Sequence, residues 1–543
     1  MGVPGFFAWL LRKDKKKILY EYLENKIDYL FLDTNGLIHP QCFKTLDENS
    51  NFKNLEELER KMIKSILDYI DFIVEYAKPQ KMVYIAVDGV APMAKIKHQR
   101  ARRYKSVVDS EKINSIKQKH NIKVNNHWSN ASITPGTSFM NKITKAIEDH
   151  ISKINSKKVI FSSALIPGEG EHKIMSFIRS QQFEPNDTFA VYGLDADLIF
   201  LSLATMKKNI FLLREYREID KQKSGLPFVW VSIDNLKQLV AKIFNEKDIV
   251  HDYTIHDFIF ICYLLGNDFI PNLQTVNIYE KGIDKILKIY CKAYKGESLI
   301  KLEKKLEINF KFLKEILFLL TLQENDTLKE QWFKSLEQRH PPGGSAYEIE
   351  MWNFENLNFS IDDPVKLGFD NHKLWQKRYY QHYFVDANNI PSICQHYFEG
   401  LYWIALYYFI DCKSWKWHYK YDQAPLVSTL YLFLKNDKLR PFTLKKDKPI
   451  SPLEQLLIVI PQKLSYLLPS EFVDLLVQFA PSSFTIDYVR KLKYWQGMPD
   501  LPAINYKKIH TLVLNKLKKP MSSQTQQLIQ SFTEDAVLVE SNN

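Results

Sequence analysis

Four carboxylates lie close to the ends of expected elements within one stretch of this chain, residues 166–201. Glu169 and Glu171 come just before a predicted helix, and Asp195 and Asp197 follow a predicted strand. Carboxylates brought this close repel one another and lose solvent, so hydrogen bonds, basic side chains or bound cations must offset the cost. Oxygen ligands without a set of Cys or His suit Mg²⁺ or Mn²⁺. The stretch therefore predicts a divalent-metal site for phosphodiester cleavage.

Three further acids occupy comparable positions. Asp33 ends the apolar run at 29–32, and Asp88 follows the apolar run at 82–87. Asp268 comes after an apolar helix expected over 258–265. Sites in parallel α/β sheets form where the carboxyl ends of strands meet, so we expect these acids beside the first four. A single Asp at a strand end is ordinarily a turn former or a helix cap, but seven acids in one topology favour metal binding.

A dense basic run follows Asp88. Lys95, Gln99, Arg102 and Arg103 are spaced i, i+4, i+7 and i+8, so a helix places them on one face. Guanidinium groups bind phosphate through paired hydrogen bonds, and this face could enclose a terminal monophosphate. The alternative is a solvated basic face or a nuclear-import patch, the usual fate of such runs. The position soon after an expected metal ligand favours the phosphate pocket.

The composition bounds the class of protein. A chain of 543 residues exceeds what one hydrophobic core serves, so two or more domains are expected. The formal net charge of +11 suits a polyanionic ligand. The five cysteines are scattered without zinc-site spacing and predict buried thiols in a reducing compartment. Because no apolar run approaches the roughly 20 residues of a membrane span, and no secretory signal is present, we expect a soluble intracellular protein.

Strands alternate with helices over residues 1–335, which predicts an α/β fold with a mostly parallel sheet flanked by helices. Residues 336–370 contain a Pro- and Gly-rich stretch and are predicted to be a linker. Residues 371–520 form a second, aromatic-rich and largely helical region, expected to pack against the first and close the site. The polar tail, residues 521–543, is expected to be frayed.

Seven motifs, in this order along the chain, resemble those of the Xrn family of 5′→3′ exoribonucleases. They are MGVPGFF at 1–7, LDTNGLIH at 32–39, VDGVAP at 87–92, ITPGT at 133–137, PGEGEHK at 167–173, GLDAD at 193–197 and GNDF at 266–269. Residues 399–425 and 452–495 resemble the family's second conserved region. The resemblance implies a PIN-like α/β domain in which seven acids hold the catalytic Mg²⁺ ions: Asp33, Asp88, Glu169, Glu171, Asp195, Asp197 and Asp268.

The resemblance also assigns the RNA contacts. It implies that Lys95, Gln99, Arg102 and Arg103 form a pocket for a 5′-monophosphate. Met93 departs from the family, which commonly has Arg at this position. The chain resembles a short form without the family's C-terminal extensions, which predicts reduced docking of partners.

Base stacking is expected from two aromatic side chains, because aromatic faces grip bases without selecting sequence. By resemblance, His39 stacks on the first base, although a lone His is more often structural. We favour Trp415 as its partner, with Trp417 and Trp403 behind it, core packing being the alternative for each. His172 is expected to be structural, since an all-oxygen magnesium site does not need it.

Together these features predict a 5′→3′ exoribonuclease that degrades 5′-monophosphorylated single-stranded RNA processively to nucleoside 5′-monophosphates, using two Mg²⁺ or Mn²⁺ ions. We expect a monomer that binds no membrane and acts in the cytoplasm, or alternatively in the nucleus, with decapping or RNA-processing partners left open. One rival is a structure-specific 5′ flap endonuclease acting on DNA. Another is an inactive RNA-binding scaffold, which should have lost at least one of the seven acids.

Overall fold

The computed structural model describes residues 5–124, 128–216, 226–245, 249, 251–277, 281–357, 363–384, 388–533 and 537–542. The start of the first family-like motif, residues 1–4, therefore lies outside the described residues. The same holds for residues 358–362 of the expected linker and 385–387 of the expected second region. Within the described ranges, no helix has both the length and the apolar character needed to cross a membrane.

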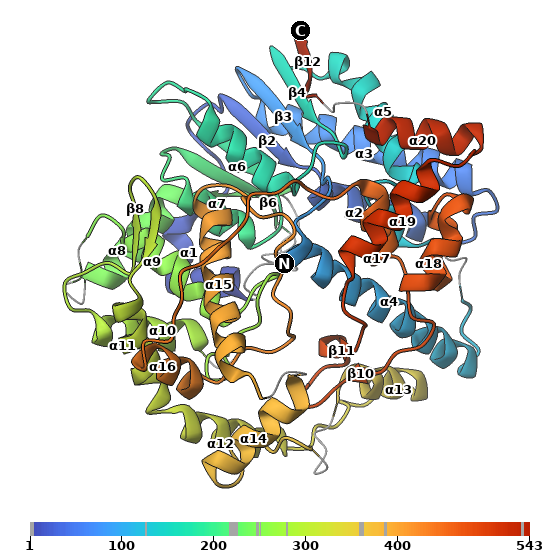
Figure 1. The fold of residues 1–543 in the computed structure, drawn as a ribbon. Coiled ribbons are helices and arrows are strands. Elements are labelled where there is room, and N and C mark those ends of the chain that lie inside the picture. The colour runs from blue at the N-terminus through green and yellow to red at the C-terminus, as the bar shows by residue number, and fades with distance from the viewer. Residues whose placement is uncertain are drawn as a thin grey trace.

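An eight-stranded sheet organises the first half of the chain (Figure 1), in the order β1-β7-β6-β5-β2-β3-β4-β12. Its five inner strands, from β6 to β4, are parallel, while β7, β1 and β12 join at the edges in antiparallel pairs. The mostly parallel sheet predicted from the sequence is confirmed. The strands are β1 Leu19–Tyr20, β2 Tyr29–Asp33, β3 Met82–Ala86, β4 Lys158–Ser162, β5 Phe189–Tyr192, β6 Ile210–Glu215, β7 Phe228–Ser232 and β12 Val539–Asn542.

The order of the strands places a topological switch between β2 and β5. From β2 the chain continues to β3 and β4 on one side, then returns to β5 and β6 on the other. Helices that follow the two neighbouring strands leave in opposite directions, so a crevice opens at their carboxyl ends. The strands themselves are nearly continuous apolar runs, as expected for a sheet that is covered on both faces.

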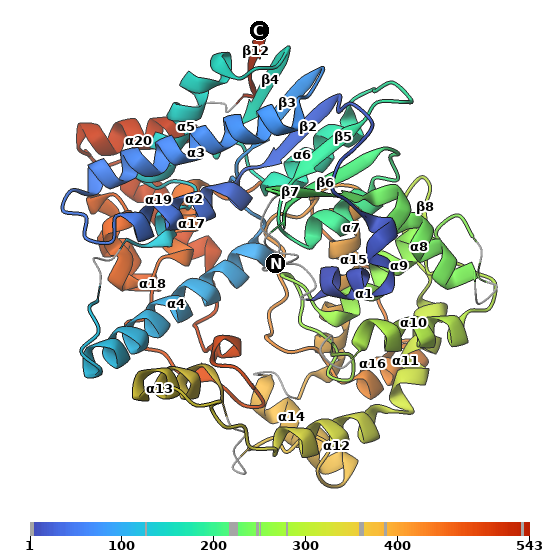
Figure 2. The ribbon, with the colours of Figure 1, turned by 180° about the vertical axis from the view of Figure 1, so that it is seen from behind.

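Each face of the sheet carries its own hydrophobic core. Alternate strand residues, such as Leu30 and Val83, pack with the helices on one side, and Phe31 and Tyr84 pack with those on the other. The view from behind in Figure 2 shows α3 across the first of these faces, with α5 nearby. The helices on the first face are α2 Asn35–Glu48, α3 Leu55–Ala77 and α5 Ser138–His150. Those on the second are α1 Phe6–Ile18, α6 Gly170–Ser180, α7 Asp197–Ala204, α8 Ile233–Asn245 and α9 Thr254–Cys262.

The second half is mainly helical and shares a core with the second face of the sheet. The apolar helix α15, Ile390–Phe409, packs against α7 with Trp403, Tyr407 and Tyr408 buried. The remaining elements from 282 onward are α10 Gly282–Ala293, β8 Ile300–Leu302, β9 Leu306–Ile308, α11 Phe310–Thr321, α12 Glu324–Ser335, α13 Ala346–Glu355, α14 His372–Tyr383, α16 Val427–Lys435, α17 Pro452–Val459, α18 Val473–Phe479, β10 Ile486–Asp487, β11 Met498–Pro499, α19 Tyr506–Leu517 and α20 Ser523–Thr533.

Two segments expected to be irregular contain helices or a strand. The predicted linker contains α13, which starts at a capping box of Ser345 and Glu348 and is tied to the preceding region by ion pairs from Glu350 to Lys119 and His120. Local capping and these ion pairs order the segment despite its Pro and Gly residues.

The tail was expected to be frayed, but it forms α20 and β12. Strand β12 pairs with the edge strand β4, with Val539 opposite Phe161, and the chain ends there at the top of Figure 1. Pairing on a sheet edge uses main-chain hydrogen bonds, so a polar sequence can form it.

Candidate active site

The seven predicted acids stand where elements begin or end. Asp33 is the last residue of β2, and Asp197 is the first of α7, just after β5. Glu169 is the N-cap residue of α6, and Glu171 lies in its first turn. The other three lie in connections: Asp88 after β3, Asp195 between β5 and α7, and Asp268 after the 3-10 turn Tyr263–Leu265. Most of them thus lie at the carboxyl edge of the parallel strands, beside the switch between β2 and β5.

The acids are close enough to repel one another. Burial, followed by the charges of Asp88 and Asp195, raises the pKa of Asp33 well above its ordinary value. Burial and the charges of Glu169 and Asp197 do the same for Glu171. A network of such perturbed carboxyl groups in one place is typical of a functional site.

Gly170 marks the point of closest approach. A methyl group at this position would lie 2.6 Å from Asp33 Oδ1 and 3.3 Å from Asp88 Oδ1. The Gly170 amide donates a hydrogen bond of 2.6 Å to Asp88 Oδ1, which holds that carboxylate against the start of α6. Burial and the charge of Glu169 nevertheless raise the pKa of Asp88 to about 6. The PGEGEHK motif therefore has Gly between its two Glu residues because two carboxylates pack onto its backbone.

Lys95 joins Asp268 to the cluster. Its Nζ lies 2.6 Å from Glu169 Oε1 and 2.6 Å from Asp268 Oδ2. Burial disfavours the charged form of Lys95 and acts to lower its pKa. The negative charges of Asp268 and Glu169 outweigh this effect and hold the pKa of Lys95 well above its ordinary value. Burial likewise acts to raise the pKa of Asp268, yet the charge of Lys95 keeps it below the usual range.

The residues present fit a divalent cation of the magnesium type. The cluster supplies carboxylate oxygens without cysteine, the donor set that Mg²⁺ and Mn²⁺ prefer. Among the described residues, Asp197 Oδ2 is buried without a hydrogen-bond partner. A buried carboxylate oxygen is costly unless a cation or a donor compensates it, so this atom is suited to a metal ligand.

The predicted phosphate pocket lies on α4, Met93–Lys119, which confirms the helix expected from the basic run. Gln99 Oε1 and Arg103 Nη1 are buried, and neither has a partner within the part of the chain that the structure describes. Burial and the neighbouring charge of Arg102 lower the pKa of Arg103 to about 9. A cation held without an anion in a partly desolvated place is prepared to bind one.

Two family models match this chain. Residues 1–216 match the family model described as "XRN 5'-3' exonuclease N-terminus". Residues 248–342 and 345–543 match the model described as "Xrn1 helical domain". The chain belongs to the XRN 5'-3' exonuclease family. The family resemblance carried by the sequence motifs is therefore confirmed.

Curated relatives of this XRN-family chain align along nearly its whole length. "5'-3' exoribonuclease 2" of Candida albicans is 28% identical over 95% of this chain and 72% of the relative. "5'-3' exoribonuclease 2 homolog" of Drosophila melanogaster is 27% identical, covering 94% of this chain and 70% of the relative. "5'-3' exoribonuclease 1" of Schizosaccharomyces pombe is 27% identical, covering 95% and 49%.

The predicted stacking residues lie at opposite ends of the basic face. His39, on α2, is beside Arg102 and Arg103, whose charges add to burial and lower its pKa to about 4. The Trp415 carbonyl accepts a hydrogen bond of 2.7 Å from the amide of Met93, the first residue of α4. The tip of the Trp415 ring lies 4.0 Å from where a Cβ of Gly168 would be, beside the acids.

The two other tryptophans pack against each other. Trp403 is buried and stacks on Trp417 with ring centroids 5.2 Å apart. Its indole nitrogen donates to the Ser414 carbonyl at 2.8 Å. Core packing therefore holds Trp403 in place and supports the segment that carries Trp415.

Two tyrosines that sequence reasoning did not assign to the site contact the acids. Tyr407 donates a hydrogen bond of 2.9 Å to Glu169 Oε2, and Tyr408 donates one of 2.7 Å to Asp197 Oδ1. Both come from α15 in the second region. The available signal was weak: a buried Tyr needs a partner for its hydroxyl, but the partner is more than 200 residues away.

Arg214, on β6, is another residue that the sequence did not reveal. Its guanidinium donates to the carbonyl oxygens of Leu194 and Asp195, and so holds the loop that carries two of the acids. His98, one turn beyond Lys95, also belongs here, with Nδ1 3.5 Å from Asp268 Oδ1.

His172 lies both in the core and beside the acids. Its ring stacks on Tyr407 with centroids 3.6 Å apart, in line with the structural role expected for it. Yet one ligand atom each from Glu169, Glu171 and His172 lie within 4.8 Å of one another, close enough to share a metal ion. Burial keeps the pKa of His172 well below its ordinary value, so the ring is neutral.

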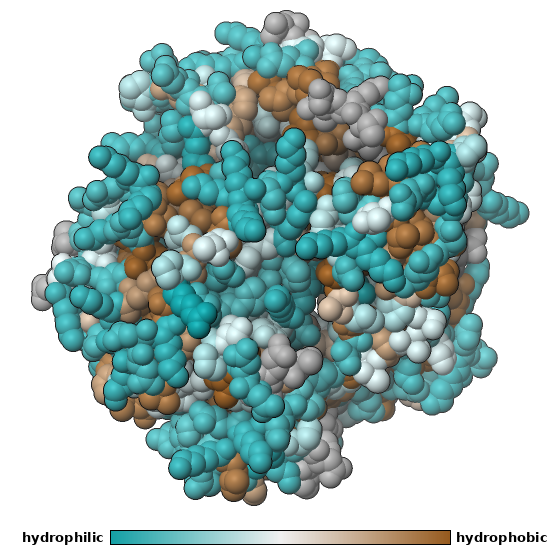
Figure 3. Space-filling view, viewed as in Figure 1, coloured by the Kyte–Doolittle hydropathy of each residue, from teal (hydrophilic) through white to brown (hydrophobic). Residues whose placement is uncertain are grey.

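The surface is consistent with a polar ligand. In the view of Figure 3 the molecule is hollowed near its centre, and hydrophilic side chains surround the hollow between the places of α15 and α4 in Figure 1.

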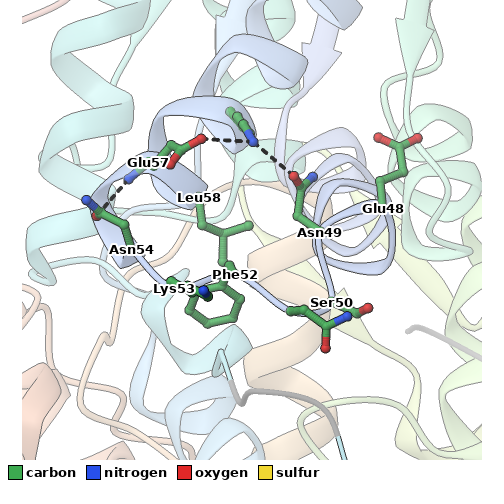
Figure 4. Close-up of a pocket in the computed structure, with 10 residues that line it drawn as sticks. Glu48, Asn49, Ser50, Phe52, Lys53, Asn54, Glu57 and Leu58 are labelled. Atoms are coloured by element: carbon green, nitrogen blue, oxygen red, sulfur yellow. Dashed lines mark hydrogen bonds and ion pairs between the residues drawn. The ribbon is translucent and has the colours of Figure 1, made fainter.

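A different pocket, of about 250 Å³, lies between the end of α2 and the start of α3 (Figure 4). It contains none of the seven acids among the described residues that line it, so it is separate from this site.

Proposed function

We propose that this chain is a 5′→3′ exoribonuclease that degrades 5′-monophosphorylated single-stranded RNA processively to nucleoside 5′-monophosphates, using two Mg²⁺ or Mn²⁺ ions. The observation that carries this proposal is the contact between a buried carboxylate cluster and a helix with a cationic face. On that face, buried polar atoms have no partner among the described residues. Its XRN-family membership and the names of its relatives support the direction and the RNA substrate.

The carboxylates would hold the cations where the scissile phosphodiester lies. Such ions, when bound, activate a water molecule and stabilise the leaving 3′ oxygen of an in-line displacement. Tyr407 and Tyr408 orient Glu169 and Asp197 through their hydroxyl groups. The burial of the cluster excludes bulk water, so each charge acts in a medium of lower dielectric than the solvent.

The basic face of α4 would select the end of the RNA. Gln99, Arg102 and Arg103 would bind the terminal phosphate by charge-assisted hydrogen bonds, with Lys95 between this pocket and the acids. His39 and Trp415 would stack on the adjoining base and position one nucleotide beyond the acids. A triphosphate or a cap adds bulk and should not fit this pocket.

The test compares 5′-phosphorylated, 5′-hydroxyl and capped RNA of one sequence, with Mg²⁺ and with EDTA. We expect nucleoside monophosphates mainly from the phosphorylated RNA, and only with Mg²⁺. Internal cuts, or better cutting of a DNA flap than of RNA, would contradict the proposal and favour an endonuclease.

The phosphate pocket is tested by Arg102→Ala, with Lys112→Ala as control because Lys112 is an exposed residue farther along the same helix. Removal of a charge-assisted hydrogen bond of about 1.5–3 kcal/mol should lower the preference for phosphate over hydroxyl ends by about 10- to 100-fold, with slow cutting retained. An unchanged preference in Arg102→Ala would show that the pocket is assigned to the wrong residues.

A further inference from the structure

Lys95 has two conflicting tasks. The family resemblance places its ammonium group on the terminal phosphate, together with Gln99, Arg102 and Arg103 of the same helix face. In the structure the ammonium group instead bridges Glu169 and Asp268, at 2.6 Å from each. All three of these charged side chains are buried, so each ion pair compensates a charge that would otherwise be costly.

The two carboxylates are also proposed metal ligands, so a divalent cation would compete with the ammonium group for them. Two positive groups at such short range repel one another strongly in a medium of low dielectric. A divalent cation carries twice the charge of the ammonium and prefers carboxylate oxygens. Binding of a cation by Glu169 and Asp268 would therefore weaken their hold on the ammonium group of Lys95.

Polar side chains farther along the helix would favour a second position for the ammonium group. Gln99 and Arg103 lie one and two turns beyond Lys95 on the same face, and each carries a buried polar atom without a partner among the described residues. Lysine has a flexible four-carbon stem, so its charge can move several ångströms without a shift of the backbone. A phosphate bound to this face would supply an anion for the displaced ammonium group.

We propose that Lys95 is an exchangeable internal cation: it competes with a divalent cation for Glu169 and Asp268, and on displacement it turns to the terminal phosphate. The first half of this proposal, competition between Lys95 and the cation, applies to the protein without RNA. The second half rests on the proposed function, and it makes cation binding and 5′-phosphate binding mutually reinforcing, because each favours the same position of Lys95.

The first experiment measures Mn²⁺ binding to the RNA-free full chain by calorimetry and electron paramagnetic resonance. Lys95→Met removes the competing ammonium group, so Mn²⁺ should bind about tenfold more tightly than to the unaltered protein. Lys97→Met is the matched control: it lies on the same helix, but its Nζ is 2.8 Å from Asp422 Oδ1, away from the acids. It should leave Mn²⁺ affinity unchanged.

A residue that only binds phosphate would not alter Mn²⁺ affinity in the absence of RNA. Equal or weaker Mn²⁺ binding by folded Lys95→Met therefore overturns the proposal. If Lys95→Met does not fold, Lys95→Gln replaces it, because the amide keeps a hydrogen-bond donor near the carboxylates and removes the charge. Lys95→Gln should also bind Mn²⁺ more tightly than the unaltered protein does. Equal or weaker Mn²⁺ binding by Lys95→Gln would likewise overturn the proposal.

The second experiment tests the coupling with a short RNA whose linkages resist hydrolysis, prepared with a 5′-phosphate or a 5′-hydroxyl end. The phosphate end should tighten Mn²⁺ binding to the unaltered protein relative to the hydroxyl end, and should have little such effect in Lys95→Met. An equal effect in both proteins would reject the exchange. Cleavage of phosphorylated RNA by the unaltered protein distinguishes failure of the exchange from failure of the proposed function. If the protein cleaves this RNA but the exchange is rejected, the proposed function still stands. If the protein neither cleaves the RNA nor binds Mn²⁺, both proposals fail.

Discussion

Removal of the Tyr408 hydroxyl tests whether the second region takes part in the site. Tyr408 donates a hydrogen bond of 2.7 Å to Asp197 Oδ1, and Asp197 is only 1% exposed. A buried hydrogen bond to an ionised group contributes about 1.5–3 kcal/mol, which corresponds to about 1–2 pH units in the pKa of the acceptor. Tyr408→Phe should therefore lower affinity for Mg²⁺ or Mn²⁺ by about 10- to 100-fold.

The sign of the pH effect follows from the carboxylate. Burial already raises the pKa of Asp197 to about 6, and the bond from Tyr408 partly opposes this by stabilising the ionised form. Without the hydroxyl the pKa rises further. Because Asp197 must be ionised to hold a cation, Tyr408→Phe should lose cation binding at a higher pH than the unaltered protein does.

The assay is Mn²⁺ affinity as a function of pH, together with the rate of RNA degradation. Tyr397→Phe is the control, since Tyr397 is on the same helix and buried, but its hydroxyl donates to the Pro271 carbonyl at 3.3 Å. Tyr397→Phe should lose about 1 kcal/mol of stability and Tyr408→Phe about 1.5–3 kcal/mol, yet only Tyr408→Phe should lose cation affinity. Indistinguishable affinities and pH profiles would refute the assigned role of Tyr408.

Two further predictions concern the packing and the charge of the cluster. In Gly170→Ala, the new methyl group would lie 2.6 Å from Asp33 Oδ1 and 3.0 Å from the Ala86 carbonyl, so it should displace Asp33 and lower kcat by about 100-fold. Gly36→Ala is the control and should retain activity, because the nearest atom to its methyl group would be 3.7 Å away. Similar rates for both variants would contradict the packing argument. Asp197→Asn should be inactive, but in EDTA at pH 7.5 it should be more stable to urea by about 2–3 kcal/mol. The reason is that folding raises the pKa of Asp197 from 3.8 to about 6. The favourable contribution of Asp197 to folding is therefore present below pH 3.8 and is lost as the pH rises through about 6. The advantage of Asn should therefore vanish below about pH 4, and equal stability at pH 7.5 would count against a buried, unfavourable charge.

Much of the fold followed from the sequence alone. The apolar runs that became β2, β3, β4 and β5 are short and bounded by turn residues, and the helices between them have regular apolar spacing. Handedness and crossover rules then leave few arrangements other than a mostly parallel sheet. Among the elements that were missed are the short edge strand β12 and the helix α13, which contact partners distant in the sequence.

The sequence by itself determined which side chains are available and at which ends of elements they lie. It placed Asp33 at the exit of a strand and Lys95 on a basic helix face, because both statements follow from local periodicity. Only the tertiary structure decided that Lys95 contacts Glu169 and Asp268, and that Tyr407 and Tyr408 reach the acids.

The physical reason is that burial and side-chain pairing depend on distances between segments far apart in the chain. The charge of a carboxylate is set by its chemistry, but its pKa and its partners are set by what the fold packs around it. Local patterns can therefore identify the reactive groups of this protein, while the balance among them exists only once the sheet, α4 and α15 have come together.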